Sequence, residues 1–188
     1  MSTIITSIDP GSPAMRAGLQ PGQQLLSING HAVMDVLDYR FYGYDPVSHL
    51  SLKNKDGSTQ KLTIHKAEGE DLGLNFDSYL MDEMRSCANH CIFCFVDQMP
   101  PGMRQTLYFK DDDARLSFLQ GNYITLTNLT EREAQRIIDL RISPINVSVH
   151  TTDPKLHCTM LGNKNAERSL DYIRAFCKAG IVMNGQIV

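Results

Sequence analysis

Three cysteines within one short stretch constrain this chain more than any other feature of its sequence. Cys87, Cys91 and Cys94 follow the spacing C-x3-C-x2-C, and the aromatic Phe93 stands just before the last of them. Thiolates bind iron tightly, and three from one loop can hold three corners of a cubane iron–sulfur cluster. No fourth cysteine is close enough in sequence to join the same loop. The fourth iron would keep an open coordination site, which predicts a reactive cluster rather than simple electron storage.

The flanks of these cysteines point to one class of protein. The spacing, with Phe93 in the aromatic position, resembles the signature of the radical S-adenosylmethionine (radical SAM) superfamily. Further segments are similar to a bacterial subgroup of iron–sulfur oxidoreductases that combine an N-terminal PDZ-like domain, a radical SAM domain and a C-terminal domain of unknown function. These segments are 94–104, 108–118, 121–128 and 148–152. The resemblance covers nearly all of the chain.

The resemblance implies a cofactor and a reaction. Cys87, Cys91 and Cys94 would ligate a [4Fe–4S] cluster, and Phe93 would lie beside the adenosine of S-adenosylmethionine bound at the open iron. One electron from a donor would cleave that cofactor to methionine and a 5′-deoxyadenosyl radical. The radical would abstract hydrogen from a substrate that the sequence does not identify. The protein would position cofactor and substrate and exclude water and oxygen.

A structural zinc site is the alternative for the same cysteines. His90, His150 or His157 could complete a Cys3His set. Zinc sites usually pair two close couples of ligands, whereas this chain has one cluster, and that difference favours iron–sulfur. The second function class is therefore a PDZ-type adaptor that binds peptides and contains a structural zinc.

Composition excludes several other classes. A net charge of −3 leaves no basic footprint for nucleic acid. We see no run of eighteen apolar residues and no basic start, so neither a membrane span nor a signal peptide is predicted. An odd number of cysteines with a metal-like cluster favours a reducing, cytoplasmic setting.

Residues 180–188 are interpreted as a buried strand in which the chain stops, so we expect an N-terminal fragment of a longer protein.

Residues 1–76 are predicted to form a small, mainly β domain. Ser12 can cap a short helix, Asn29-Gly30 is a strong signal for a tight hairpin, and Asp35 can cap a helix to about Tyr42. Asp56-Gly57 marks a turn between two further strands. The predicted strands cover 4–8, 25–28, 50–52 and 62–64. The glycines and prolines at 10–30 resemble those of bacterial PDZ domains.

A peptide site is predicted in the same domain. PDZ domains add a peptide as a strand, and the backbone amides of a Φ-Gly-Φ loop hold its terminal carboxylate. Leu72, Gly73 and Leu74 have this pattern. They follow the domain's other strands instead of preceding them, so the domain is predicted to be circularly permuted. The partner would be a peptide or a protein C-terminus. In the alternative interpretation, this stretch is a scaffold strand leading into the next domain.

Residues 77–188 are predicted to begin a (β/α) barrel, which makes the whole chain a two-domain α/β protein. A weak strand is expected at 79–81, followed by clear strands at 123–127 and 145–149. Thr130 and Glu133 form a capping box, and a second helix is expected at about 165–179. Its buried stripe would contain Ala166, Leu170, Ile173 and Cys177. Alternating strands and helices predict a parallel sheet, and the resembled superfamily has a partial barrel.

The ends of the strands are predicted to surround the cofactor. Chemistry in such barrels gathers at the carboxyl ends of strands, which places the cysteine loop, 87–94, near Thr127, Asn128, His150 and Gln186. The superfamily often has Gly-Gly-Glu at one strand end to bind the methionine amino group. This chain has 125–128, Thr-Leu-Thr-Asn, in its place, so that contact stays unassigned. The acidic run 111–113 could bind a divalent cation, but such runs are usually solvated faces.

Overall fold

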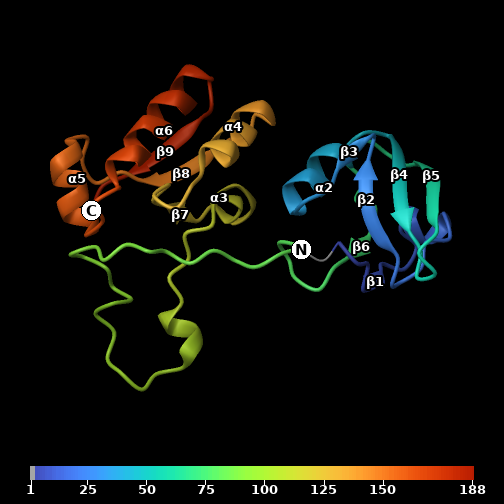
Figure 1. The fold of residues 1–188 in the computed structure, drawn as a ribbon, viewed down its shortest axis with the longest axis horizontal. Coiled ribbons are helices and arrows are strands. Elements are labelled where there is room, and N and C mark those ends of the chain that lie inside the picture. The colour runs from blue at the N-terminus through green and yellow to red at the C-terminus, as the bar shows by residue number, and fades with distance from the viewer. Residues whose placement is uncertain (1–2) are drawn as a thin grey trace. The chain divides into compact units, whose positions relative to one another are not determined.

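The computed structural model describes residues 3–188, and the chain folds as two compact units. The N-terminal unit ends at Glu83, and the C-terminal unit begins at Met84. Each unit has its own sheets and its own buried apolar side chains, so each is described by itself (Figure 1). Within residues 3–188, no helix is both long enough and apolar enough to cross a bilayer.

An antiparallel sheet lies at the centre of the N-terminal unit, with the strand order β3-β2-β4-β5. Its strands are β2 (Gln24–Ile28), β3 (His31–Ala32), β4 (Val47–Lys53) and β5 (Thr59–His65). A separate antiparallel pair joins β1 (Ser7–Ile8) to β6 (Leu74–Asn75). The two helices are α1 (Pro13–Arg16) and α2 (Val36–Tyr42). The pairing of β1 with β6 brings the two ends of the unit together. The circular permutation itself stays a prediction.

The caps and turns of this unit form at the predicted residues. The side chains of Ser12 and Asp35 accept hydrogen bonds from backbone N–H groups in the first turns of α1 and α2. Asn29 and Gly30 join β2 to β3 with φ angles of 51° and 83°, the positive values that a tight type I′ hairpin requires. These local predictions are confirmed.

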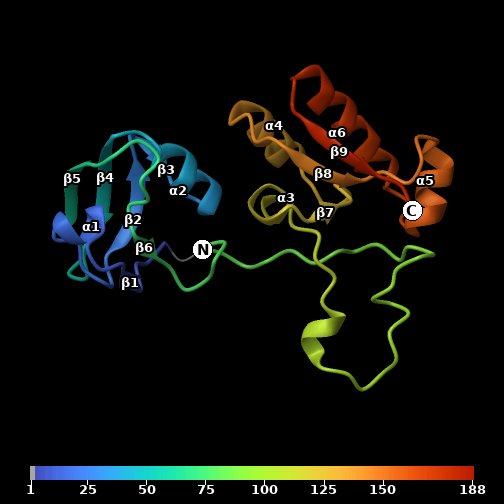
Figure 2. The same cartoon turned by 180° about the vertical axis from the view of Figure 1, so that it is seen from behind.

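A parallel three-stranded sheet lies at the centre of the C-terminal unit, with the order β7-β8-β9. Its strands are β7 (Tyr123–Ile124), β8 (Ile145–Ser148) and β9 (Met183–Gln186). Its helices are the 3-10 helix η1 (Gln105–Tyr108), α3 (Ala114–Gln120), α4 (Glu131–Asp139), α5 (Pro154–Leu161) and α6 (Glu167–Lys178). Helices α4 and α6 lie side by side in both views (Figures 1 and 2). The mixed α/β class is confirmed, and the incomplete barrel stays a prediction because three parallel strands also begin an open sheet.

Three strand predictions are corrected by the structure. Residues 79–81 form turns and bends, and Met81 has a φ of 66°. The strand predicted at 123–127 ends at Ile124, because Leu126, with a φ of 60°, turns the chain. The segment 180–188 is extended only over β9, which is mostly exposed since it pairs with β8 alone at the edge of the sheet.

The prediction that Cys177 lies on the buried stripe of α6 is wrong, because its side chain is exposed. Phe176, the residue just before Cys177 in α6, is fully buried instead. The larger apolar side chain gains more from leaving water, so the buried face turns toward it. Ala166 and Leu170 are buried as predicted.

Two α-helices of the C-terminal unit, α3 and α5, are absent from the sequence prediction. Both begin at an aspartate whose side chain accepts a backbone hydrogen bond, and both end at a glycine with left-handed backbone. These residues are Asp113 and Gly121 for α3, and Asp153 and Gly162 for α5. The signals were present, but each helix is too short to show a clear apolar period.

Candidate functional site

The cysteine loop is attached to the C-terminal end of α5 by its backbone. The N–H of His90 donates to the carbonyl of Leu161 at 3.0 Å, and the N–H of Ile92 donates to Met160 at 3.0 Å. The contact leaves no room for a side chain at Gly162, because a Cβ there would lie 2.3 Å from the carbonyl oxygen of His90. On its other side, the loop is held by the N–H of Cys87, which donates to the carbonyl of Lys110 at 2.6 Å.

All three loop cysteines are free thiols and partly buried. Burial raises the pKa of Cys87. Burial, followed by the neighbouring thiols of Cys87 and Cys94, raises the pKa of Cys91 to about 11. The Lys110 ammonium acts in the opposite direction on Cys87 and Cys91. The three sulfurs are therefore near enough to influence one another electrostatically.

The chemistry of these donors fits an iron–sulfur cluster, since three thiols from one loop can each become a thiolate ligand. The three sulfurs do not surround a common point as the ligands of a bound cluster would. Within residues 3–188, no three His, Cys, Asp or Glu side chains are gathered in a metal-binding arrangement. This holds for the Cys3His zinc alternative as much as for the cluster.

Two of the predicted cofactor residues lie against each other. The rings of Phe93 and His150 have centroids 4.4 Å apart and are tilted by 56°. Nδ1 of His150 is buried and has no hydrogen-bond partner among residues 3–188. Burial and the nearby His157 lower the pKa of His150, so its ring is neutral at pH 7. A neutral ring with an unsatisfied nitrogen beside Phe93 is suited to a ligand that supplies a hydrogen bond.

The other predicted residues at the strand ends bind the chain itself. The hydroxyl of Thr127 donates to Oδ1 of Asn89 at 3.0 Å, and Nδ2 of Asn128 donates to the carbonyl of Asp112 at 3.1 Å. Gln186 lies at the end of β9, and its carbonyl accepts from the N–H of His150 at 3.2 Å. The structure thus brings the ends of β7, β8 and β9 to the vicinity of the cysteine loop.

The acidic run 111–113 is neither a solvated face nor a cluster open to a cation. Asp112 is almost fully buried and accepts hydrogen bonds from the N–H and the hydroxyl of Thr125, both at 2.6 Å. Burial raises the pKa of Asp112 to about 6. Burial would also raise the pKa of Asp113, but its ion pair with Arg115 outweighs burial and lowers it. Asp111 accepts from Asn122 at 2.5 Å.

In the N-terminal unit, the predicted carboxylate loop already has partners. The N–H of Gly73 donates to Oδ1 of Asp71 at 2.7 Å, and the N–H of Leu74 donates to the hydroxyl of Tyr39 at 3.2 Å. That hydroxyl in turn donates to Oδ1 of Asp71 at 2.8 Å. Leu72 and Leu74 are buried. The Asp71 side chain therefore takes the place that a ligand carboxylate would need at the Gly73 amide.

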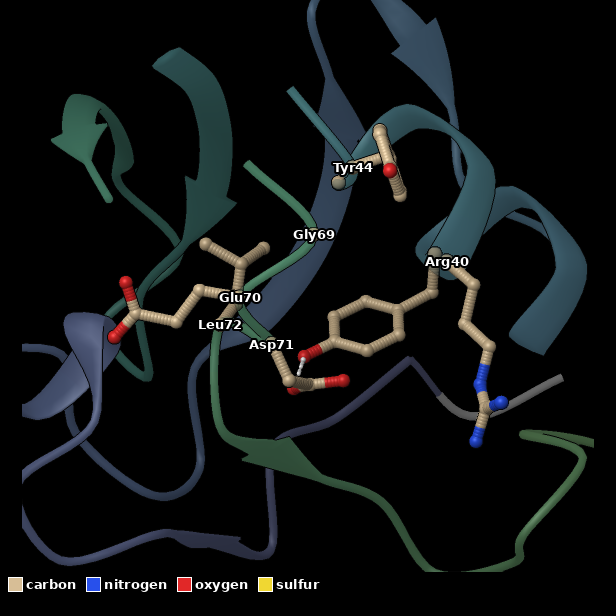
Figure 3. Close-up of a pocket in the computed structure, with 8 residues that line it drawn as sticks. Arg40, Tyr44, Gly69, Glu70, Asp71 and Leu72 are labelled. Carbon is tan, nitrogen blue, oxygen red and sulfur yellow. Dashed lines mark hydrogen bonds between the residues drawn. The ribbon is translucent and has the colours of Figure 1, made fainter. Parts of the chain in front are cut away.

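Two cavities lie between α2 and the segment that contains this loop, and Tyr39 and Asp71 line both. One has a volume of about 290 Å³ and is bordered by Arg40, Tyr44 and residues 69–72 (Figure 3). The other, of about 220 Å³, extends past Leu74 to Met81. Tyr39 and Asp71 thus form part of the wall of both cavities.

Comparison with known protein families agrees with the order of the two units. The model of a family described as a radical SAM-like domain matches residues 66–188, and the model of the PDZ domain matches residues 4–53. The predicted combination of an N-terminal PDZ domain and a following radical SAM domain is confirmed. No curated protein matches the chain.

Proposed function

This chain belongs to the family defined by a radical SAM-like domain, and from that membership we propose that it is an enzyme that cleaves S-adenosylmethionine reductively. Cys87, Cys91 and Cys94 would hold its [4Fe–4S] cluster. When bound, such a cluster supplies an open iron and a single electron. The observation that carries the proposal is a loop of three free thiols, attached beside the ends of parallel strands. Five free cysteines also support a reducing, cytoplasmic location.

The chain's own residues would prepare this site. Because burial raises the pKa of Cys87 and Cys91, these thiols keep their protons at neutral pH until a metal displaces them. The ammonium of Lys110 makes that release easier. Phe93 and His150 form a largely apolar wall that would exclude water, and Nδ1 of His150 would accept or donate a hydrogen bond to the cofactor. In this proposal Thr127 acts on the cofactor through Asn89 of the cysteine loop, and Asn128 acts through the carbonyl of Ser86, just before that loop.

The test is anaerobic reconstitution with iron and sulfide, followed by electron paramagnetic resonance of the reduced protein with and without S-adenosylmethionine. We expect a four-iron signal that changes when the cofactor is added. Cys91→Ala should remove that signal, and Cys177→Ser, which changes an exposed thiol outside the loop, should keep it. Zinc in place of iron, with no such signal, would contradict the enzyme and favour the adaptor with a structural zinc.

The PDZ domain supports a second, independent proposal, that the N-terminal unit binds a peptide or protein C-terminus and brings it to the enzyme. Leu72, Gly73 and Leu74 would form its carboxylate loop. Because Asp71 already accepts from the Gly73 amide, a ligand carboxylate would have to displace the Asp71 side chain. Binding by the wild-type chain is therefore expected to be weak.

Replacing Asp71 tests this peptide site directly. In Asp71→Ala the Gly73 amide is left without its internal acceptor, so we expect tighter binding of peptides from a C-terminal library, measured by fluorescence anisotropy. Asp45→Ala, an exposed acid of the same unit, is the matched control. Peptides with an amidated C-terminus should not gain affinity. No binding by either variant would contradict the proposal and leave this stretch as scaffold.

A further inference from the structure

Asn89 occupies an unusual position in the middle of the cysteine loop. It lies between Cys87 and Cys91, yet only 1% of it is exposed. Loops usually run over the surface, and a buried amide is costly unless its donors and acceptors are paired. The side-chain amide of Asn89 therefore needs hydrogen-bond partners inside the protein.

Those partners come from two distant parts of the C-terminal unit. Nδ2 of Asn89 donates to the hydroxyl of Thr125 at 2.9 Å. Oδ1 accepts from the hydroxyl of Thr127 at 3.0 Å and from Nδ2 of Asn163 at 2.7 Å. Thr125 and Thr127 follow β7, and Asn163 lies in the turn between α5 and α6. One amide thus joins the cysteine loop to the end of a strand and to a helical turn.

The backbone of Asn89 is held as well. Its carbonyl accepts from the ammonium of Lys110 at 2.7 Å, and its N–H donates to Sγ of Cys87 at 3.4 Å. The same ammonium contacts both carboxylate oxygens of Asp97 at 3.0 Å. Asp97 lies just past Cys94 in the sequence, so Lys110 spans the loop from its middle to its far end.

We propose that Asn89 is the positioning residue of the metal site: before any metal binds, it anchors the backbone of the cysteine loop to the end of β7 and to the turn after α5, and the three thiols close around the metal when it arrives. A loop whose middle is already anchored loses less conformational entropy when it takes up a ligand, so the metal is held more tightly. The identity of the metal group rests on the function proposed above, whereas the position of the loop does not. Apart from the bond from its N–H to Sγ of Cys87, Asn89 acts on the metal through the position of the cysteines on either side of it.

Asn163→Asp is the sharpest test, because it replaces one donor to Asn89 by an acceptor and adds one negative charge. Oδ1 of Asn163 accepts from the N–H of Asn165 at 2.9 Å, and an aspartate keeps that acceptor. The NH2 group that donates to Asn89 is replaced by an oxygen, which repels the Asn89 oxygen. Asn89→Ala removes all three side-chain bonds. Lys164→Ala, an exposed residue of the same turn, is the matched control.

The first measurement is hydrogen exchange of the His90 and Ile92 amides in the full chain without metal. Both amides are bonded to α5, so they report how often the loop lifts off it. We expect exchange at least about tenfold faster in Asn163→Asp, faster still in Asn89→Ala, and unchanged in Lys164→Ala. Exchange that rises equally throughout the C-terminal unit would show a merely structural role and overturn the proposal.

The second measurement is the loss of iron to a chelator after anaerobic reconstitution. We expect several-fold faster loss from both Asn variants than from the wild type. Iron loss that is unchanged in both variants would overturn the proposal, and so would unchanged exchange of the His90 and Ile92 amides. If the wild-type chain takes up no iron while the local exchange still rises in the variants, the proposed function fails and the role of Asn89 in holding the loop stands.

Discussion

Asp112 shows how a single side chain makes the stability of the C-terminal unit depend on pH. Burial raises its pKa to about 6, although Thr125 donates two hydrogen bonds to the carboxylate. A raised pKa means that the folded chain binds the proton more tightly than the unfolded chain. The contribution of Asp112 to stability is therefore fully present below about pH 4 and is lost as the pH rises through about 6.

We expect Asp112→Asn to remove this loss, because an amide stays neutral and still offers an acceptor to the N–H of Thr125. The free energy of unfolding of the variant, minus that of the wild type, should rise by on the order of 3 kcal/mol between pH 4 and pH 7. Urea unfolding across this range measures it. Asp45→Asn, at an exposed acid, is the control. A difference that does not vary with pH would contradict the raised pKa.

Glu133 shows the opposite behaviour at the start of α4. Burial would raise its pKa, but hydrogen bonds from Arg85 and from Thr130 outweigh burial and lower it to about 2. Its stabilisation is therefore present above about pH 4.5 and lost as the pH falls through about 2. We expect Glu133→Gln to lower the free energy of unfolding by about 1–2 kcal/mol at pH 7.

The matched control for this capping prediction is Glu131→Gln. Glu131 stands in the same first turn, but its side chain is 87% exposed and its contact with Arg168 is long, at 3.7 Å. Exposed pairs of this kind contribute little, so this variant should unfold like the wild type. Equal losses in the two variants, measured by urea unfolding at pH 7 and pH 3, would refute the special role of Glu133.

The close contact between α5 and the cysteine loop predicts that a side chain at Gly162 destabilises the C-terminal unit. In Gly162→Ala, the new Cβ would collide with the backbone of His90, which cannot move without leaving α5. Gly180→Ala is the matched control: Gly180 also ends a helix with positive φ, at 76°, but has open space around it. The strain of positive φ is common to both variants, so we expect Gly162→Ala to melt several degrees lower than Gly180→Ala. Equal melting temperatures would contradict the close approach.

Short sequence signals predict where helices begin better than they predict which face of a helix or strand is buried. Ser12, Asp35 and Thr130 cap helices as expected, because a cap depends on a few neighbouring residues. The sequence does not predict that Cys177 is exposed on α6, since the burial of that residue depends on what packs against the helix. It does not predict the exposure of β9 either, because an apolar run does not distinguish an edge strand from a central one.

At the candidate site too, the sequence predicts local features and not contacts between residues far apart in the chain. The spacing of Cys87, Cys91 and Cys94 is visible in the sequence, and it led to the family that the comparison then showed. The role of Asn89 was not visible. Its hydrogen bonds join residues 36, 38 and 74 positions away along the chain, and no local pattern encodes such distances. The burial of Asp112 within an acidic run was hidden for the same reason.

Separate cores predict that the two units unfold as separate cooperative blocks. The N-terminal unit buries Ile5, Leu25 and Leu52 around its antiparallel sheet, whereas the C-terminal unit buries Ile145 and Phe176 around its parallel sheet. Compact units with their own cores usually unfold independently. We therefore expect two transitions in calorimetry of the wild-type chain without metal.

One variant in each unit assigns these transitions. Tyr39→Phe removes the hydroxyl that bonds Asp71 and the amide of Leu74, so it should lower the transition of the N-terminal unit alone, by about 1–3 kcal/mol in free energy. Gly162→Ala should lower only the other transition. Tyr79→Phe, at an exposed tyrosine of the N-terminal unit, should leave both in place. A single transition that Tyr39→Phe and Gly162→Ala both shift would mean that the two units unfold together, and iron added to the cysteine loop would then stabilise the whole chain instead of the C-terminal unit alone.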